Sequence, residues 1–345
     1  MKSTEKAVLA ERLTAQGLSG PPLPDPASVA ERLLAVQGQD PRGFRLAVRA
    51  RTEGLTAAHV ERALAERELI VTWLNRGTLH LVRSEDYPLL QSLTTPPLFT
   101  SSVRRLRQEG VSEAEAERAI ETIERALGNE GPLTRVQLRE QIDAAGVRTD
   151  GQAMIHLLFL AAVRGIVVRG PMIGKQHAYV LVRDWLEEPR PIDREKALAE
   201  LARRYLVGHQ PASDRDLAKW AGLPLRDARA GMKAIASELE EGESGLVSLA
   251  RRPAPEKLPP PRLLGAFDPV LLGWTSREPI LGSHTRLVTR NGIFHPFAMV
   301  NGRAVAKWGL AGGRLTLEPL QKLPAKVAAA LDRDATEITC FLVSD

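Results

Sequence analysis

Three segments of this 345-residue chain carry the same helix-start pattern at almost equal spacing. In each segment an apolar residue precedes a hydroxyl residue, and a second apolar residue follows four positions later; the hydroxyl residues are Thr56, Thr134 and Ser213. A hydroxyl group at a helix start accepts a hydrogen bond from the free backbone N–H groups, and the apolar pair fixes the direction of the chain. Such caps are common on any helix, but spacings of 78 and 79 residues favour an internal repeat.

The segments around these caps predict helices followed by a two-stranded hairpin. The first set has helices at 28–37 and 57–67 and a hairpin across 68–82, where apolar runs flank Asn75-Arg76-Gly77. A similar order returns twice: helices at 113–128, 131–146 and 151–165 before strands in 166–182, then helices at 193–206, 210–223 and 225–239 before a short strand near 245–250. This order is typical of a winged helix, which is a helix-turn-helix followed by a hairpin.

The C-terminal part of the chain has a different character. A proline-rich linker covers 253–262, two Asn-Gly turns lie at 291–292 and 301–302 among strand-like residues, and one helix is expected near 323–332. We therefore predict an α+β chain with three tandem winged-helix domains and a C-terminal antiparallel β-barrel. The expected domains are winged helix 1 at 1–110, winged helix 2 at 111–190, winged helix 3 at 191–256 and the barrel at 257–345.

The composition narrows the function classes. With 47 basic and 42 acidic side chains, the net charge of +5 permits a polyanionic partner without requiring one. The single cysteine, Cys340, excludes a disulfide framework and a Cys-x-x-Cys metal site, and it suits a reducing cytoplasm. The chain has no recognisable signal peptide and no apolar run of about 18 residues, so we expect a cytoplasmic protein that spans no membrane.

Common catalytic signatures are missing from the sequence, which has no HExxH zinc motif, no complete phosphate-binding loop and no nucleophile elbow. The seven histidines are not paired at metal-ligand spacing, and His156 on an apolar helix is expected to be a packed core residue. We therefore expect no metal and no cofactor. Asp268 is expected to cap a turn before Pro269, and three tryptophans are expected to lie in the core: Trp220, Trp274 and Trp308.

The segment 36–40, Val-Gln-Gly-Gln-Asp, places two glutamines at the expected end of the first helix. Gly38 could take the left-handed conformation that ends a helix, and both carboxamides would then project from the helix end. Considered alone, the residues favour a simpler interpretation, in which Gln37 and Gln39 lie on the surface or cap free carbonyls.

A resemblance to a known family changes this interpretation. It is carried, in order, by VQGQDPR (36–42), NRGTLHLV (75–82), GPLTRVQL (131–138), PASDRDLAKWAGL (211–223), GAFDPVLLGW (265–274) and RNGIFHPFAMVNGRAVAKWGL (290–310). Over about residues 25 to 320 the chain resembles the AlkZ-like (YcaQ-related) winged-helix DNA glycosylases. The resemblance implies a concave clamp for duplex DNA, built from three winged helices and a β-barrel. It also implies a catalytic Gln-x-Gln motif, or Gln-x-Asp in the YcaQ branch, which falls here on Gln37 and Gln39, with Gly38 in place of the usual aliphatic residue.

Two glutamines suit a substrate whose bond is already weak. A carboxamide does not titrate near neutral pH, so it can hold a water and orient its dipole but cannot act as a strong acid or base. Alkylation at N7 gives a purine a positive charge, and the base can then leave without a proton. The resemblance implies hydrolysis of N7-alkylated purine nucleotides, including bulky adducts and interstrand crosslinks, as in self-resistance to a genotoxic natural product such as azinomycin B. No lysine is implicated as a nucleophile, so we expect a monofunctional glycosylase.

Contacts to DNA are expected from basic and polar side chains after the motif and on the hairpins. They are Arg42 and Arg45 after the glutamines, Arg76, Thr78 and His80 on the first hairpin, Lys175 on the second hairpin, and Arg286, Arg290 and Asn291 on a hairpin of the expected barrel. Thr78 and His80 share one face of a strand. The alternative is a solvated loop for Arg42 and Arg45 and an ordinary hairpin for the barrel residues, whereas the face of Thr78 and His80 could instead point toward the neighbouring domain. Because tandem winged helices in one chain reduce the need for a dimer, we expect a monomer bound to double-stranded DNA that contains N7-alkylpurine lesions or crosslinks.

Two other functions are compatible with the sequence. A winged-helix chain without a catalytic glutamine pair is most simply a non-catalytic DNA-binding regulator. Winged helices also bind proteins, so a protein-interaction scaffold is a further alternative. Release of free N7-methylguanine from duplex DNA, lost on Gln37→Ala and Gln39→Ala, separates the glycosylase from both.

Overall fold

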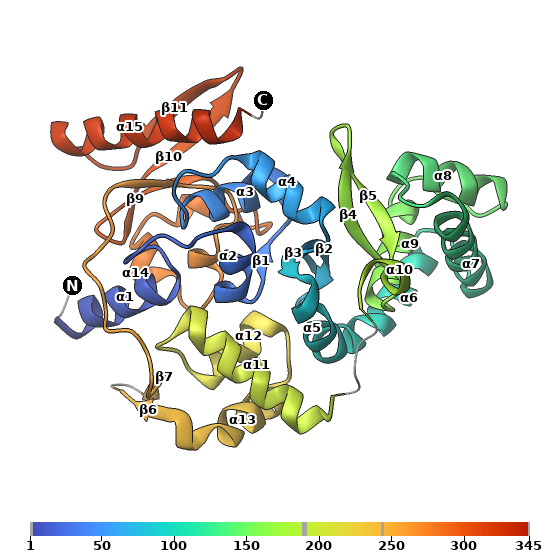
Figure 1. The fold of residues 1–345 in the computed structure, drawn as a ribbon, viewed down its shortest axis with the longest axis horizontal. Coiled ribbons are helices and arrows are strands. Elements are labelled where there is room, and N and C mark those ends of the chain that lie inside the picture. Colours follow the sequence, from blue (N-terminus) through green and yellow to red (C-terminus); the bar gives the residue numbers. More distant parts are fainter. Residues whose placement is uncertain (1–2, 188–191, 243–244, 344–345) are drawn as a thin grey trace. The chain divides into compact units, whose positions relative to one another are not determined.

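The structure, a computed structural model, describes residues 3–187, 192–242 and 245–343. These residues belong to two compact units (Figure 1). Unit 1 holds the residues up to Val60 together with those from Asp193 onward, and unit 2 holds Glu61–Ile192. Across the described ranges, no helix combines the length and the apolar content that crossing a bilayer requires.

Unit 1 is built from both ends of the chain. Its N-terminal part contains α1 (Ser3–Ala15), α2 (Pro26–Leu33), β1 (Val36–Gln37) and α3 (Pro41–Arg49). Its C-terminal part contains α11 (Arg194–His209), α12 (Asp214–Ala221), α13 (Leu225–Ala234), β6 (Leu239–Glu241), β7 (Val247–Leu249), β8 (Arg262–Leu264), α14 (Glu278–Leu281), β9 (Phe297–Val300), β10 (Arg303–Ala311), β11 (Arg314–Pro319) and α15 (Ala325–Leu342). The predicted linker has no helix or strand before β8 begins. α4 (Ala57–Ala65) carries the chain from unit 1 into unit 2.

The first predicted helix, 28–37, ends earlier than expected. α2 stops at Leu33 because Leu34 adopts a φ of 60°, outside the helical region. The cap expected of Gly38 is therefore made by Leu34, and the chain continues as the extended strand β1. The glutamine motif thus begins in a short strand and not at the end of a helix, which corrects the prediction.

The core of unit 1 beside α11 is aromatic. His209 stacks on Tyr205 with ring centroids 4.6 Å apart, and it also packs against Trp220 and Trp274. Trp274 donates its indole N–H to the backbone carbonyl of His209 at 2.7 Å. Trp308 is buried as well. The prediction that these three tryptophans belong to the core is therefore confirmed.

The C-terminal strands form an open sheet, so the predicted β-barrel is wrong. The strand order is β11-β10-β9-β8, with every pair antiparallel. The predicted turn at Asn301-Gly302 joins β9 to β10, with both residues at positive φ. The outer edge of β8 is not available to a further strand, because its Leu263 N–H donates to the Asp334 carboxylate of α15 at 2.6 Å. A helix therefore covers the edge that a barrel would have closed.

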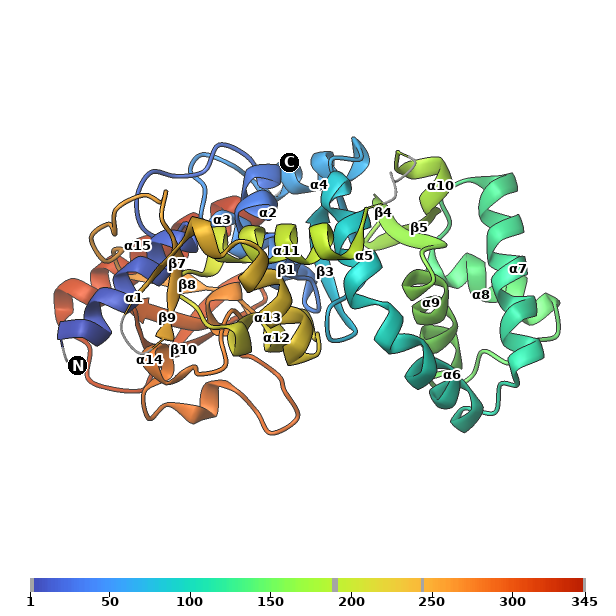
Figure 2. The ribbon, with the colours of Figure 1, turned by 90° about the horizontal axis from the view of Figure 1, so that it is seen from below.

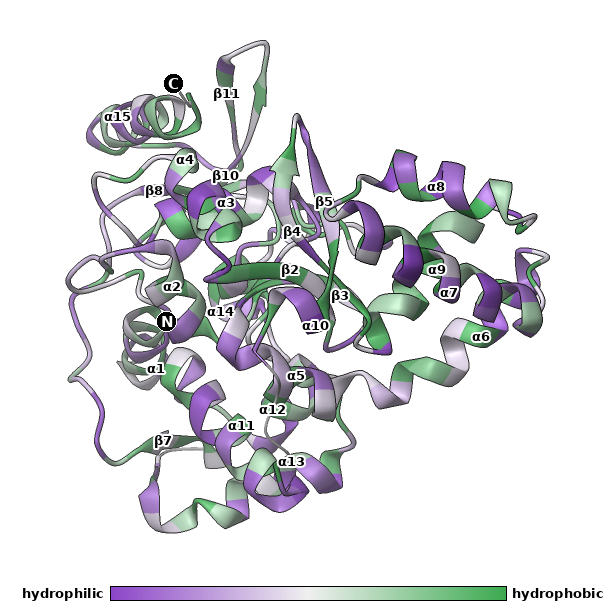
Figure 3. Ribbon diagram, turned by 45° about the vertical axis from the view of Figure 1, so that its right-hand side comes forward, coloured by the Kyte–Doolittle hydropathy of each residue, from purple (hydrophilic) through white to green (hydrophobic). Residues whose placement is uncertain are grey.

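Unit 2 contains the first two predicted hairpins and the helices between them. Its elements are β2 (Leu69–Leu74), β3 (Thr78–Arg83), α5 (Tyr87–Thr94), α6 (Phe99–Gln108), α7 (Glu113–Glu130), α8 (Arg135–Ala144), α9 (Ala153–Val163), β4 (Val167–Ile173), β5 (Gln176–Leu181) and α10 (Val182–Trp185). β2 pairs with β3 and β4, and β4 pairs with β5, all antiparallel. β2 is buried along its whole length, and most of the strand is hydrophobic (Figure 3). The predicted hairpin turn is confirmed, with Asn75 and Gly77 at positive φ.

The predicted hydroxyl caps are present in both units. Thr134 caps α8 and Ser213 caps α12, and each forms a reciprocal capping box with the residue three positions later. At the start of α4, the Thr56 N–H donates to Nδ1 of His59 at 3.1 Å. A histidine thus takes the place that glutamine or aspartate holds in the other two caps.

Candidate active site

The glutamine motif connects β1 to α3. Gln37 is 6% exposed, so its side chain is almost wholly covered, whereas Gln39 is exposed. Asp40 caps α3, because its Oδ1 accepts the Gly43 N–H at 2.6 Å. This carboxylate offsets the positive end of the α3 dipole. The segment therefore presents one buried and one accessible carboxamide beside a fixed negative charge.

Two glycines hold α3 against the segment 265–268. A Cβ on Gly43 would lie 2.3 Å from the carbonyl oxygen of Ala266, and a Cβ on Gly265 would lie 2.9 Å from Cβ of Leu46. Neither position leaves room for a side chain, so the two backbones are in direct contact. The start of α3, and with it the end of the glutamine motif, is fixed by this contact.

A buried ion pair lies at the far end of α3. Arg51 and Asp268 have no exposed side-chain surface, and their two hydrogen bonds measure 2.9 and 3.0 Å. Gln16 binds the same guanidinium through its backbone and side-chain oxygens. Asp268 also accepts the Val270 N–H at 3.0 Å, which confirms the predicted cap before Pro269. The ion pair itself joins residues 217 positions apart, and no local pattern in the sequence could have revealed it.

The two arginines after the motif differ in exposure. Arg42 is exposed, and its Nη1 donates to the Leu310 carbonyl at 3.2 Å. Arg45 is only 7% exposed; its guanidinium lies over the Phe44 ring and donates to the Pro41 carbonyl at 2.7 Å. Arg42 is therefore accessible at the surface, whereas Arg45 is mostly internal, and contact of either side chain with DNA stays a prediction.

The loop predicted to reach DNA is present as a turn and not as a strand hairpin. Thr289 N–H donates to the Ile293 carbonyl at 2.9 Å, Gly292 has a φ of 76°, and one bridge joins the flanking residues. The candidate side chains of this loop, Arg286, Arg290 and Asn291, are all exposed. The turn is thus confirmed, and its contact with DNA stays a prediction.

The candidates in unit 2 lie on its two hairpins. Arg76 is exposed at the β2–β3 turn, Thr78 is half-buried, and Lys175 is exposed at the β4–β5 turn. His80 is 3% exposed and donates from Nδ1 to the Thr78 carbonyl at 2.8 Å. Burial, and secondarily the charge of Arg76, lowers the pKa of His80 to about 3. His80 is therefore neutral and almost wholly covered, so it does not offer a DNA phosphate an exposed cation.

The prediction that His156 is a packed core residue is wrong. His156 is half-buried on α9, and its Nε2 accepts a hydrogen bond from Arg105 Nε at 3.3 Å. Among the residues that the structure describes, no three His, Cys, Asp or Glu side chains gather closely enough to hold a metal ion.

We expect acidification to destabilise the fold through two buried histidines. Burial lowers the pKa of His80 to about 3 and that of His209 to about 4, whereas both would titrate near 6.5 in the unfolded chain. The unfolded state therefore binds more protons below about pH 6.5, so the free energy of unfolding falls as the pH drops from there. Urea denaturation between about pH 7.5 and about pH 5 measures this slope. His80→Asn retains a donor near the Nδ1 position. It should make the slope of the free energy of unfolding against pH shallower, by up to the amount that corresponds to about one proton bound on unfolding. An unchanged slope would contradict the prediction.

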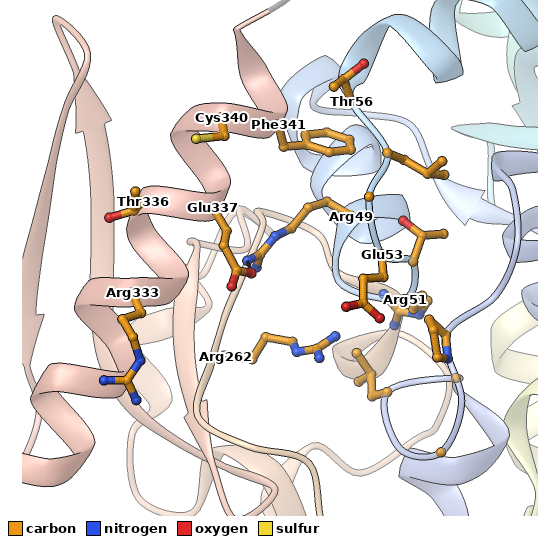
Figure 4. Close-up of a pocket in the computed structure, with 17 residues that line it drawn as sticks. Arg49, Arg51, Glu53, Thr56, Arg262, Arg333, Thr336, Glu337, Cys340 and Phe341 are labelled. Carbon is orange, nitrogen blue, oxygen red and sulfur yellow. Dashed lines mark hydrogen bonds and ion pairs between the residues drawn. The ribbon is translucent and has the colours of Figure 1, made fainter.

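A cavity of about 750 Å³ lies between α15, β8 and the C-terminal end of α3 (Figure 4). Arg49 and Glu337 pair within it at 2.7 Å. Arg262 donates to the Ala50 carbonyl, and burial lowers the pKa of Arg262. The residues of the glutamine motif do not line this cavity. The ion pair between Arg49 and Glu337 attaches α15 to the end of α3, so these charges have a structural role in unit 1.

Comparisons with known proteins agree with the resemblance seen in the sequence. The family model of AlkZ-like DNA glycosylases matches residues 30–341. The chain is 27% identical over 370 residues to an interstrand DNA cross-link repair glycosylase of Streptomyces sahachiroi, with 98% of this chain and 96% of the relative covered. The solved structure of Streptomyces sahachiroi DNA glycosylase AlkZ matches with a TM-score of 0.79 and 26% identity, with 99% of this chain and 97% of that chain covered.

Proposed function

This chain belongs to the AlkZ-like family of DNA glycosylases, and from that premise we propose that it hydrolyses the N-glycosidic bond of N7-alkylated purines in duplex DNA. The substrates include bulky adducts and interstrand crosslinks, and the biological role is self-resistance to a genotoxic natural product of the azinomycin B kind. The observation that carries the proposal is the Gln37/Gln39 pair, one side chain buried and one accessible, next to the capped start of α3.

In this reaction the protein needs only to position a water molecule and to stabilise positive charge on the sugar. An N7-alkylated base leaves as a neutral molecule, so the developing charge is a positive one on the sugar. In the proposed mechanism the accessible carboxamide of Gln39 holds the attacking water, and the buried carboxamide of Gln37 fixes the orientation of the pair. The Asp40 carboxylate offsets the positive end of α3, which would otherwise oppose a cationic sugar.

DNA is held in this proposal by the exposed candidate side chains. Arg42, Arg286, Arg290 and Asn291 belong to unit 1, and Arg76 and Lys175 belong to unit 2. Contacts of this kind go to phosphates and position the duplex without reading its sequence. The proposal keeps the division into three winged-helix domains, at 1–110, 111–190 and 191–256, and a monomeric protein.

A duplex containing a single N7-methylguanine tests the proposal directly. We expect the purified protein to release free base, measured by chromatography, and to leave an abasic site in an intact strand. Residues 26–51 around the motif contain no lysine, so borohydride added during the reaction should trap no covalent protein–DNA adduct. Binding of the duplex without base release would favour the non-catalytic regulator, and a trapped adduct would show a bifunctional enzyme instead.

A further inference from the structure

Two parts of the chain have three helices followed by an antiparallel hairpin: α7, α8 and α9 before β4 and β5, and α11, α12 and α13 before β6 and β7. In helix-turn-helix proteins, the later helix of the motif lies against DNA. α9 is not available for this role, because it packs within unit 2 against α6, α7, β2 and β4. Its Leu157, Leu158 and Leu160 are buried, and Phe159 packs edge-on against Trp73 at 5.8 Å.

α13 is packed through one face and open on the other. Ala228, Gly231 and Met232 are buried against α11, and their spacing of three and four residues places them on one side of the helix. A Cβ on Gly231 would lie 2.5 Å from the Leu198 carbonyl oxygen, so the two helices are in backbone contact. The rotation of α13 about its axis is thereby fixed, which also fixes the direction of its other face.

The open face of α13 carries a row of cations. Arg226, Arg229 and Lys233 are all exposed, and steps of three and four residues place them in one line along the helix. The arginine side chains are 85% and 60% exposed. Ala230 and Ala234 lie beside them and are also exposed. These small residues allow a large ligand to come close to the helix.

Neighbouring carboxylates orient these arginines without neutralising the surface. Arg229 Nε lies 2.8 Å from Asp214, and Arg226 Nε lies 3.3 Å from Asp227. A guanidinium has five N–H donors, so an ion pair through Nε leaves donors for a phosphate. α12 and α13 together carry five basic residues but only two acidic residues that are not buried, so the surface keeps a positive net charge.

α11 connects this surface to the glutamine motif within unit 1 (Figure 2). It packs against α13 and also against α2. A Cβ on Gly208 would lie 2.3 Å from the Arg32 carbonyl oxygen, and Arg204 donates to the Glu31 carbonyl at 3.1 Å. Close backbone contacts thus run from α13 through α11 to α2, which leads directly into β1. A ligand held on α13 is therefore kept at a fixed distance from Gln37.

We propose that α13 is a phosphate-binding helix whose Arg226, Arg229 and Lys233 grip the backbone of duplex DNA. The inference rests on the proposed function in taking DNA as the ligand. The long flexible cations, with alanines between them, suit a row of phosphates better than the edges of particular bases. Contact without sequence reading fits an enzyme that must find a lesion wherever it occurs.

The test is the affinity of the full chain for an undamaged duplex, measured by fluorescence anisotropy over a series of salt concentrations. The triple variant Arg226→Gln, Arg229→Gln, Lys233→Gln should bind more weakly, and the slope of log affinity against log salt should become shallower by about three, one for each lost phosphate contact. The matched control is Lys322→Gln, Lys326→Gln, Arg333→Gln, which removes the same charge from exposed positions in and just before α15. The control should retain most of the affinity.

Two further measurements keep the inference separable from the proposed function. The double variant Arg226→Lys, Arg229→Lys retains the positive charges and should keep most of the slope of log affinity against log salt. If the arginines acted only by holding the local structure through their guanidinium groups, this variant would lose affinity as the glutamine variant does. If the wild-type protein releases no base but the α13 variant still loses duplex affinity, the glycosylase proposal fails and the phosphate-binding helix stands. Equal affinity and slope for the α13 variant and wild type would overturn the inference, whatever the activity.

Discussion

Replacement of Gln39 by alanine is expected to slow single-turnover base release from N7-methylguanine DNA by up to about 100-fold. Removal of one preorganised polar contact costs other enzymes roughly 100- to 1,000-fold, and the penalty here falls at the lower end because the alkylated base already leaves slowly unaided. Gln39 is exposed, so its truncation leaves no cavity in the core. The rate constant at saturating enzyme is the quantity to measure, since it excludes changes in DNA affinity.

The companion variants distinguish catalysis from folding. Gln37 is 6% exposed, so Gln37→Ala also removes buried volume and should lower stability. The urea midpoint of this variant must therefore be measured, so that a loss of activity is not mistaken for a loss of folded protein. Gln39→Asp should retain much of the activity, because a carboxylate can also hold the water and the YcaQ branch carries aspartate at this position. Wild-type rates in both Gln37→Ala and Gln39→Ala would remove the chemical basis of the proposal.

The elements that could be predicted from the sequence are those that local chemistry determines. The turn at Asn75-Arg76-Gly77 depends on residues that accept positive φ between two apolar runs. The helix starts at Thr134 and Ser213 depend on a side chain and a backbone group three residues apart. Each of these features is complete within a few residues, so a sequence pattern contains all of its causes.

The features that could not be predicted depend on distant residues. α2 ends because a leucine, Leu34, takes a positive φ, which no local propensity indicates. The barrel prediction failed because an edge N–H of β8 is bound by Asp334, on a helix that begins more than 60 residues later. For the candidate site, the sequence shows which side chains are polar but not which of them are buried. Arg45 and His80 are of residue types that often contact ligands at a surface, yet both lie almost wholly inside the protein.

The second large effect is expected at the buried ion pair of α3. Arg51→Met should lower the free energy of unfolding by about 3 to 5 kcal/mol, because it leaves the Asp268 carboxylate buried without a partner. Globular proteins have only about 5 to 15 kcal/mol of stability in total, so a change of this size should be plain in urea denaturation. Arg183→Met, which removes an ion pair to Glu124 from an arginine that is 61% exposed, should cost less than about 1 kcal/mol.

The double variant Arg51→Met with Asp268→Asn separates the lost charge from the lost contacts. Asparagine can still accept the Val270 N–H, so the cap remains while the unpaired charge disappears, and the double variant should be more stable than Arg51→Met alone. Equal stability of the two variants would mean that the unpaired charge of Asp268 is not the cause of the lost stability. Because that segment contacts the start of α3 through Gly43, a recovery of stability should be accompanied by a recovery of base release. Such parallel recovery would show that an unpaired carboxylate at Asp268, and not the loss of the arginine alone, disturbs the geometry of the two glutamines.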